Sequence, residues 1–395
     1  MSSNDNVVIV SGVRTPMGSF QGSLSSLSAV DLGAIVIKES VARAGLQPDD
    51  IQEVFMGCVL PAGLKQGPAR RAARLAGLPD STGATTIGKR CASGMKSAML
   101  AHDLIKAGTN DIFVAGGMES MSNAPYLLLN ARKGYRMGHG DQVQDHLFLD
   151  GLEDADTGKL MGGYAQDVAD KKGYTREEMD QYAIQSLTRA KQAIEQGKLE
   201  PEIIPVTVKT RKGEVVVKDD EQPFNADIEK IPHLRPAFKK DGTVTAANSS
   251  SISDGASALV IMRESEAEKR GIKPMARIIA HTTHSRQPAE FTIAPVYAVR
   301  SLLEKTGWSK DDVDIYEINE AFATVAMMPI KELGLNPERV NIYGGACAQG
   351  HPVGSTGSRI VVTLMNALKQ TQGKKGIASL CVGGGEATAM AIEML

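Results

Sequence analysis

The chain has 395 residues, 42% hydrophobic and 23% charged, a composition typical of a globular protein long enough for more than one domain. Its net charge of -2 at pH 7 gives no overall attraction to nucleic acid or to an anionic membrane, so neither partner is expected. The cysteines lack metal-ligand spacing, and a chain of this length needs no disulfide staples. We therefore expect no bound metal and a reducing compartment, the cytoplasm, for the thiols of Cys58, Cys91, Cys347 and Cys381.

The chain begins with a short polar stretch that leads at once into an apolar run, Val7 to Val10, which predicts a strand. This start leaves no room for a signal or transit peptide, and no apolar run approaches the length of a membrane span. Leu32 and Val36 then mark one face of a helix, and Ile112 to Ala115 predicts a second buried strand. This alternation favours an α/β architecture.

The sequence changes character in its middle third. Residues 123–242 carry charged segments, a predicted helix from about Arg176 to Gln196, and a predicted hairpin that turns at Arg211 to Gly213. An insertion of this size with its own elements is expected to bind a substrate or a partner rather than to act as a linker.

The last third repeats the order of the first. Ala276 to Ile279 predicts a strand, Val299 to Glu304 a helix, and Ile377 to Val382 a buried strand that ends in glycines. The loop at residues 44–51 also has a counterpart at 306–313, and each copy follows a predicted helix and precedes a strand. Matching order of several elements favours an internal duplication over a chance likeness of common loops.

These features divide the chain into three parts. The first half comprises residues 1–122 together with 243–270, the inserted loop domain comprises 123–242, and the second half comprises 271–395.

Cys91 is the first candidate catalytic residue. It precedes Ala92, Ser93 and Gly94 and an amphipathic run, which would place its thiol at a helix N-terminus where the thiolate is stabilised. Taken alone, a small buried core thiol is the plainer interpretation. The adjacent Lys89-Arg90 pair and three further motifs favour the reactive one.

Those motifs lie far downstream. His351 stands between Gly350 and Pro352 in a glycine-rich stretch whose backbone can approach a ligand closely. Cys381 ends a predicted strand before three glycines, whose free amides can point at a developing oxyanion. Asn319 is either a holder of a water or a carbonyl, or a turn-forming residue.

With these motifs in this order, the chain resembles the thiolase family over essentially its full length. Cys91 in Cys-Ala-Ser-Gly, Asn319 in Asn-Glu-Ala-Phe, His351 in Gly-His-Pro and Cys381 in Cys-x-Gly-Gly-Gly match the family motifs. The resemblance implies a thiolase fold, a duplicated five-layered α-β-α-β-α core with an inserted loop domain that cradles coenzyme A.

The resemblance also implies a ping-pong mechanism. Cys91 would be the nucleophile, His351 would draw its proton, and Cys381 would be the acid and base at the α-carbon of acetyl-CoA. His351 and a water on Asn319 would form one oxyanion hole, and the backbone amides of Cys91 and Gly383 the other.

Segments of the insertion look like the short-chain acetoacetyl-CoA branch, which implies reversible condensation of two acetyl-CoA molecules to acetoacetyl-CoA and free coenzyme A. It also implies a homotetramer built as a dimer of dimers, with acyl-CoA as the small-molecule partner and no cofactor beyond the coenzyme A of the substrates. The substrate contacts that the resemblance assigns are Met161, Phe238, Ala246, Ala247, Ser250, Phe291 and Phe322.

Several positions depart from the family pattern. Gly88 and Leu160 stand where many relatives have Asn and His, and Gln222 stands where a basic residue commonly contacts the adenine. Potassium activates one branch through backbone carbonyls and a tyrosine hydroxyl, but the tyrosine position is Leu187 here, so potassium is only weakly expected. Cys347 replaces an aliphatic residue and is either a packing residue or a site of oxidation.

Three other functions share parts of this pattern. Decarboxylating ketoacyl synthases share the fold but use histidines where Cys381 stands, which argues against them. A 3-ketoacyl-CoA thiolase of broader chain length in fatty-acid β-oxidation differs in acyl-length preference. A non-enzymatic acyl-CoA-binding protein on a thiolase scaffold would be expected to have lost Cys91, His351 or Cys381, and all three are present.

Overall fold

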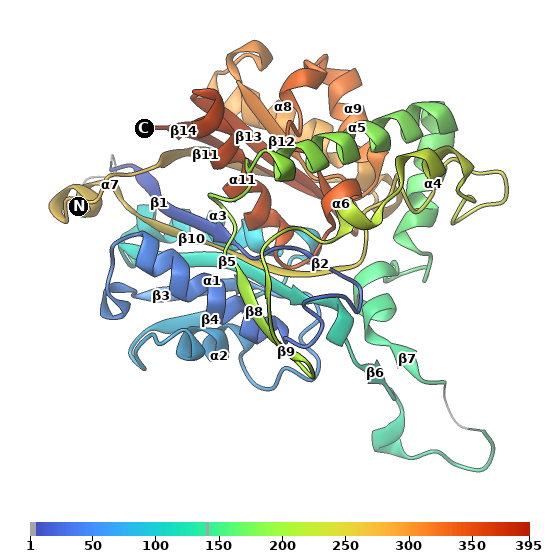
Figure 1. The fold of residues 1–395 in the computed structure, drawn as a ribbon, viewed down its shortest axis with the longest axis horizontal. Helices are drawn as coiled ribbons and strands as arrows, with labels where there is room; N and C mark the ends of the chain where they lie inside the picture. Colours follow the sequence, from blue (N-terminus) through green and yellow to red (C-terminus); the bar gives the residue numbers. More distant parts are fainter. Residues whose placement is uncertain (1–4, 140–141) are drawn as a thin grey trace.

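The structure is a computed structural model that describes residues 5–139 and 142–395 (Figure 1). The predicted α/β architecture is confirmed, because one long mixed sheet runs through both halves of the chain. In the first half its strands lie in the order β4 (Gly83–Ile87), β3 (Glu53–Gly57), β5 (Ile112–Ser120), β10 (Ser253–Arg263) and β1 (Val7–Arg14), with the short β2 (Gly18–Ser19) beside β10. In the second half the order is β12 (Ile315–Ile318), β13 (Lys375–Val382), β14 (Glu386–Met394) and β11 (Ala276–Ser285).

The two halves repeat one topology. The order β3-β5-β10-β1 corresponds to β12-β13-β14-β11, and in each set the first two strands are parallel while the following neighbours are antiparallel. A short ladder between β1 and β11, at Val8 with Arg277 and Ile9 with Ala276, joins them. The predicted internal duplication is therefore confirmed.

The duplicated loops also share a local structure. Short 3-10 helices at Pro48–Asp50 and Lys310–Asp312 both begin with a capping box, in which the aspartate at the third position accepts the N–H of the residue before the helix.

Helices form the outer and middle layers. Helices α1 (Ala29–Arg43) and α2 (Pro68–Leu75) cover one face of the first half, α8 (Ala294–Thr306) and α9 (Ala323–Leu333) cover the far face of the second, and α3 (Ser93–Ala107) and α11 (Thr356–Thr371) lie between the halves. The short α7 (Glu264–Lys269) follows β10. This confirms the five-layered arrangement.

Alternation along the strands explains the layers. In β1, Val8 and Val10 join the outer core with α1, whereas Val7 and Ile9 join the middle core with α3 and α11. Successive side chains of a strand point to opposite faces, so a strand that is apolar at every position is buried on both sides.

Residues between β5 and β10 form the inserted part. It holds β6 (Tyr126–Leu127), β7 (Gln144–Asp145), a π-helix at Leu147–Leu152, α4 (Met161–Lys172), α5 (Arg176–Glu195), β8 (Val206–Thr210), β9 (Gly213–Val217), α6 (Gln222–Asn225) and a 3-10 helix at Ile228–His233. The predicted helix and hairpin are thus confirmed in α5 and β8-β9. Residues 126–139 and 142–145 project away from the body as an arm (Figure 1).

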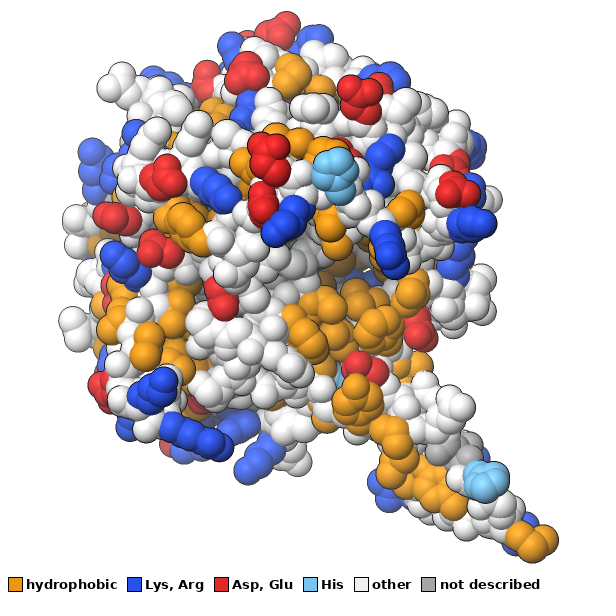
Figure 2. Space-filling view, turned by 45° about the vertical axis from the view of Figure 1, so that its right-hand side comes forward, with side chains coloured by type: hydrophobic (Ala, Val, Ile, Leu, Met, Phe, Trp, Pro, Cys, Tyr) orange, Lys and Arg blue, Asp and Glu red, His pale blue; other side chains and the backbone are white. Residues whose placement is uncertain are grey.

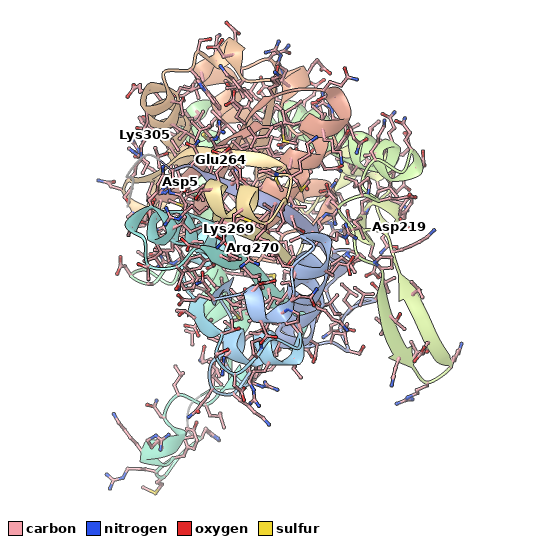
Figure 3. All side chains as sticks on the ribbon, turned by 90° about the vertical axis from the view of Figure 1, so that its left-hand side faces the viewer. Asp5, Asp219, Glu264, Lys269, Arg270 and Lys305 are labelled. Carbon is pink, nitrogen blue, oxygen red and sulfur yellow. The ribbon has the colours of Figure 1, made fainter. Side chains whose placement is uncertain are left out.

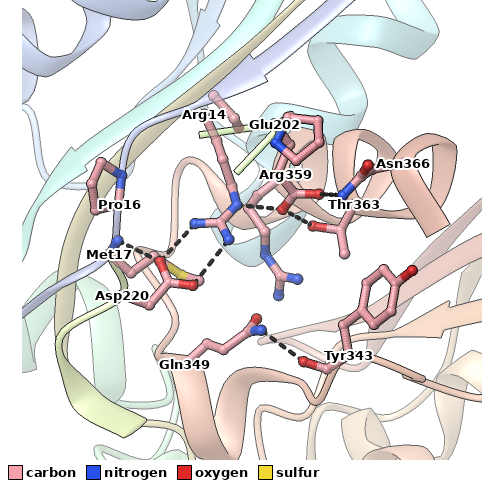
Figure 4. A network of polar contacts seen from close by, with 12 residues as sticks. Arg14, Pro16, Met17, Glu202, Asp220, Tyr343, Gln349, Arg359, Thr363 and Asn366 are labelled. Atoms are coloured by element: carbon pink, nitrogen blue, oxygen red, sulfur yellow. Dashed lines mark hydrogen bonds and ion pairs between the residues drawn. The ribbon is translucent and has the colours of Figure 1, made fainter. Parts of the chain in front are cut away.

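A buried ionic network ties this insertion to both halves (Figure 4). Arg14 at the end of β1 pairs with Glu202 at 2.6 Å and with Asp220 at 2.6 Å, and all three side chains are almost fully buried. Thr363 and Asn366 of α11 donate to the same Glu202 carboxylate at 2.9 Å. Burial alone would lower the pKa of Arg14, but the two carboxylates outweigh it and raise that pKa.

Candidate active site

A cavity of about 430 Å³ lies where the insertion meets the two halves. Two of the predicted catalytic side chains, Cys91 and His351, and the predicted oxyanion residue Gly383 line it. Cys381 and Asn319 are fully buried and do not line the cavity. Six of the seven predicted substrate contacts also line it, namely Met161, Phe238, Ala246, Ser250, Phe291 and Phe322, whereas Ala247 packs beside Leu187.

A strained turn presents the Cys91 thiol to the cavity. Cys91 lies in a single 3-10 turn, Arg90–Ala92, that runs directly into α3, and Arg90 has a positive φ of 47°. Ser93 closes the turn, because its hydroxyl accepts the Lys89 amide at 2.8 Å and donates to the Arg90 carbonyl at 2.6 Å. Positive φ is costly for a residue with a side chain and is typical of functional turns.

Opposing influences act on the Cys91 thiol. Burial raises its pKa above the ordinary value, while the backbone N–H groups of Gly383 and Cys91, both directed at the sulfur, and the charge of Arg90 act in the opposite direction. The resting side chain is therefore a thiol that needs a base when it attacks. The same two amides would face an oxyanion formed on a carbon bonded to this sulfur.

The glycine loop after Cys381 is held against the nucleophile turn. Arg90 Nη1 donates to the Gly383 carbonyl at 2.9 Å, and Lys89 Nζ pairs with Glu386 at 2.8 Å. Gly385 has a φ of 87°, and a Cβ there would lie 2.4 Å from the carbonyl oxygen of Arg286, so only glycine fits. These contacts join β13 of the second half to α3 of the first.

Cys381 is the second-last residue of β13, and its side chain is fully buried. Burial, followed by the neighbouring Cys91 thiol, raises the pKa of Cys381 well above its ordinary value. A thiol in this state is a proton donor, and it becomes a strong base once it is deprotonated.

The hydrogen bonds of His351 fix its tautomer. Its Nδ1 lies 2.6 Å from the hydroxyl of Thr356, and that hydroxyl donates its own proton to the Pro352 carbonyl at 3.0 Å. With that proton on the Pro352 carbonyl, the hydroxyl accepts from Nδ1–H and the lone pair lies on Nε2. Within the described residues Nε2 has no partner, and His351 lines the cavity.

The electrostatic setting keeps this imidazole neutral. Burial, with a smaller contribution from the charge of Arg359, lowers the pKa of His351 to about 3. A neutral ring with a free Nε2 can accept a proton from a thiol beside it.

Glu119 at the end of β5 anchors the loop that follows His351. One carboxylate oxygen accepts the amides of Gly354 at 2.8 Å and Val59 at 2.9 Å, and the other accepts the amide of Leu60 at 3.1 Å. Burial raises the pKa of Glu119 to about 7, and the three amides oppose that rise. The residue thus fixes the His351 loop to β5 and to the segment after β3.

Glu320 plays the same part on the other side of the site. Its carboxylate accepts from Tyr182 at 2.9 Å, Ser186 at 2.7 Å and Asn341 at 2.9 Å, and the amide of Cys347 donates to it at 3.1 Å. The network joins α5 to the segment that leads through α10 (Ala346–Gln349) to His351.

Asn319 precedes Glu320 in the chain, and Cys347 contacts Glu320 in space. Asn319 is buried, and neither polar atom of its carboxamide has a partner in the described part of the chain, so it is available to a water or a carbonyl. The Cys347 sulfur donates to the Glu320 carbonyl oxygen at 3.6 Å. Burial and the Glu320 charge raise the pKa of Cys347 well above its ordinary value, which favours a packing role.

Aromatic side chains narrow the cavity. The ring centroid of Phe322 lies 6.2 Å from that of Phe291 and 6.3 Å from that of Phe238, with both pairs edge to face. Gln222 and Leu160, two of the departures from the family pattern, line the same cavity.

The residues around Leu187 do not fit a potassium ion. Leu187 is buried and packs with Ala190, Ile231, Ala348 and Ala247 in an apolar cluster. An aliphatic side chain at this position supplies no oxygen, and alkali cations require oxygen ligands. Leu187 therefore supplies no side-chain ligand to a cation at this position.

Sequence reasoning did not find the positioning roles of three residues, although it counted Arg90 in favour of a reactive Cys91. Thr356, Glu119 and Arg90 each lie within or next to a recognised motif. The partners of Glu119 and Arg90 are far away in the sequence, whereas Thr356 contacts His351 within one loop. The positive φ of Arg90, the burial of Glu119 and the contact of Thr356 with His351 reveal these roles, and none of the three is visible in a string of residues.

Comparisons with known proteins agree with this geometry. The family model described as thiolase, N-terminal domain, matches residues 7–265, and the model described as thiolase, C-terminal domain, matches residues 272–394. The mitochondrial acetyl-CoA acetyltransferase of Bos taurus is 47% identical over 99% of this chain and 92% of its own length. The cytosolic acetyl-CoA acetyltransferase of Gibberella zeae is 47% identical over 98% of both chains.

Two solved structures share the fold over the whole chain. The Acat5 thiolase of Ascaris suum in complex with coenzyme A has a TM-score of 0.94 and 42% identity, and covers 99% of this chain and 100% of its own. The acetyl-CoA acetyltransferase of Bacillus anthracis has a TM-score of 0.96 and 42% identity over 99% of both chains. These matches confirm the family resemblance seen in the motifs and the fold that it implied.

Proposed function

The chain belongs to the thiolase family, and we propose that it is an acetyl-CoA C-acetyltransferase. It joins two acetyl-CoA molecules into acetoacetyl-CoA and coenzyme A, and runs the reverse thiolysis, through an acetyl group on Cys91. The observation that carries the proposal is the meeting at one cavity of a Cys91 sulfur facing two backbone amides and a His351 Nε2 with a free lone pair. The buried thiol of Cys381 lies in contact with the same site.

Thiolysis begins with attack of the Cys91 sulfur on the ketone of acetoacetyl-CoA. His351 Nε2 takes the thiol proton, and the carbon–carbon bond breaks. Cys381 gives its proton to the departing α-carbon, so that acetyl-CoA leaves and Cys381 becomes a thiolate.

Deacylation restores every group. The thiol of a second coenzyme A gives its proton to the Cys381 thiolate and attacks the acetyl carbonyl. Cys91 leaves and takes back its proton from His351. Condensation is the same sequence run in reverse, in which Cys381 removes the α-proton of acetyl-CoA.

Two measurements together test the proposal. The first is the coenzyme A-dependent loss of 3-ketoacyl-CoA absorbance over acyl chains of increasing length, and the second is intact-mass detection of the acylated protein. Activity centred on the four-carbon substrate, with an acetyl group on Cys91, supports it. Comparable rates on long chains would assign a broader 3-ketoacyl-CoA thiolase instead. Absence of acylation would assign an acyl-CoA-binding protein.

We also propose that the chain assembles as a homotetramer, a dimer of dimers. Tyr126, Leu129 and Met137 on the projecting arm are exposed hydrophobic residues, and Figure 2 shows such side chains running along it. Strand β4 pairs only with β3 among the described strands, so its other edge can pair with a second copy. Light scattering on the parent and on Met137→Asp tests this, because loss of the arm contact should leave dimers.

No helix in the described ranges is long and apolar enough to cross a membrane. We propose the cytoplasm as the compartment, since the cysteines are free thiols, and the test is fractionation of the source cells. We propose that coenzyme A is the only cofactor-like group in the reaction. Thiolysis rates that stay the same when K⁺ replaces Na⁺ at constant ionic strength would support this.

A further inference from the structure

Two histidines and one aspartate meet on the surface where α3 passes β11. His102 and Asp103 lie on α3, and His281 lies on β11. Asp103 Oδ1 is 3.0 Å from His102 Nδ1 and 2.9 Å from His281 Nε2. The two imidazole rings stand edge to face with centroids 5.1 Å apart.

These three side chains have the geometry of a metal site. Their ligand atoms all lie within 4.8 Å of one another, and no other group of His, Cys, Asp and Glu in residues 5–139 and 142–395 meets this test. Ligands held about 2.0–2.2 Å from a tetrahedral ion are about 3.3 Å apart, so small side-chain rotations would admit one. Asp103 is 52% exposed, which leaves a position for water.

The ligand chemistry favours one class of ion. Two imidazoles and a carboxylate suit Zn²⁺ and its first-row neighbours, whereas Mg²⁺ and Ca²⁺ prefer sites made of oxygen. His102 Nδ1 and His281 Nε2 both face Asp103 Oδ1, so an ion placed among the three atoms would take the place of the two N–H protons.

The surrounding charges moderate the affinity. Lys106 faces His102, and Lys96 and Lys305 face His281, while Asp103 is the one carboxylate in contact with both rings. Lys305, labelled in Figure 3, donates to the carbonyl of His281 at 3.1 Å rather than to the carboxylate. Lys305 therefore does not compete with an ion for the Asp103 carboxylate.

We propose that His102, Asp103 and His281 form a binding site for a divalent first-row transition ion, with Zn²⁺ as the ion. The site would link α3 of the first half to β11 of the second. His102 lies about 16 Å along the helix from Cys91 at 1.5 Å per residue, so the ion touches no reacting atom. Its effect is on stability, and the turnover number stays unchanged when it binds.

Titration of the chelator-treated, tag-free full chain with Zn²⁺ tests the proposal by calorimetry and by thermal unfolding. We expect one Zn²⁺ ion to bind per chain and to raise Tm. His281→Gln and Asp103→Asn should each lower the affinity for this Zn²⁺ ion by at least about tenfold, because each removes one of three ligands. His284→Gln is the matched control, since it lies on the same strand outside the cluster and should leave this affinity unchanged.

Cobalt separates this site from the active-site thiols. Co²⁺ bound here should show ligand-field bands without thiolate charge transfer, and those bands should vanish in His281→Gln. Zinc-edge anomalous scattering from a crystal should place the ion about 2.0–2.2 Å from the three ligand atoms. Zinc held only through cysteine, or equal affinity in the parent and both ligand variants, would overturn the proposal and leave a hydrogen-bonded His-Asp-His cluster.

Discussion

His351 Nδ1 lies 2.6 Å from the Thr356 hydroxyl, and this contact decides which nitrogen of the ring is a base. With its proton on the Pro352 carbonyl, the hydroxyl accepts from the imidazole Nδ1–H. Thr356 therefore acts on the reaction through His351 and is a positioning residue.

Replacing Thr356 by valine should expose this role. Thr356→Val keeps the shape but removes the acceptor of Nδ1–H, and we expect kcat to fall by about tenfold to a hundredfold with little change in KM. Thr356→Ser should retain most activity because it keeps the hydroxyl. Steady-state thiolysis kinetics measure both, and equal kcat values for the valine variant and the parent would contradict the assignment.

Serine variants of Cys91 and Cys381 should lose different partial reactions. Cys91→Ser should form no acyl-enzyme with acetyl-CoA, because the nucleophile is lost. Cys381→Ser should still be acetylated on Cys91 but should fail to exchange the α-proton of acetyl-CoA with solvent deuterium. Intact mass and proton NMR report the two steps. Exchange by Cys381→Ser at the parental rate would refute its acid and base role.

The raised pKa of Cys91 predicts how its reactivity depends on pH. Below its pKa the thiolate fraction rises tenfold per pH unit, so alkylation by iodoacetamide should accelerate through pH 9 without a plateau. Cys347 and Cys381, whose pKa values are raised further by burial, should be modified more slowly. Peptide mass mapping over a pH series measures this, and a plateau of the Cys91 rate below pH 8 would show a depressed pKa instead.

The apolar surroundings of Leu187 predict that potassium does not raise kcat. Exchanging Na⁺ for K⁺ at constant ionic strength should change kcat by less than about twofold, because the apolar cluster around this residue supplies no hydroxyl ligand. Leu187→Tyr offers the missing oxygen beside Ala247 and is the variant in which activation should appear. Strong activation of the parent by K⁺ would mean that another ligand completes a site.

The buried Arg14 network predicts a large loss of stability. Glu202→Gln removes one charge from a fully buried pair, and we expect the free energy of unfolding to fall by about 3–5 kcal/mol. The control is Glu39→Gln at the half-exposed pair with Arg43, where the cost should be below about 1 kcal/mol. Urea denaturation measures both, and equal costs would show that the buried pair contributes no more than a surface pair.

Several parts of the molecule could be predicted from residues alone. Apolar runs such as Val7 to Val10 and the periodic face of Leu32 and Val36 determine strands and helices locally, because side-chain period follows backbone geometry. The repeated loops at residues 44–51 and 306–313 revealed the duplication, since each copy folds its own capping box. The motifs around Cys91, His351 and Cys381 predicted the chemistry because they carry the reactive groups themselves.

Tertiary structure alone decided the protonation and the orientation of those groups. The fixed loop at Gly354 depends on Glu119, the position of Gly383 depends on Arg90, and the cluster of His102 with His281 depends on α3 lying beside β11. A hydrogen bond or a desolvated charge depends on distance in space, and residues far apart in the sequence meet only when the layers pack. The sequence therefore determined which groups the protein carries, and packing determined their protonation, orientation and partners.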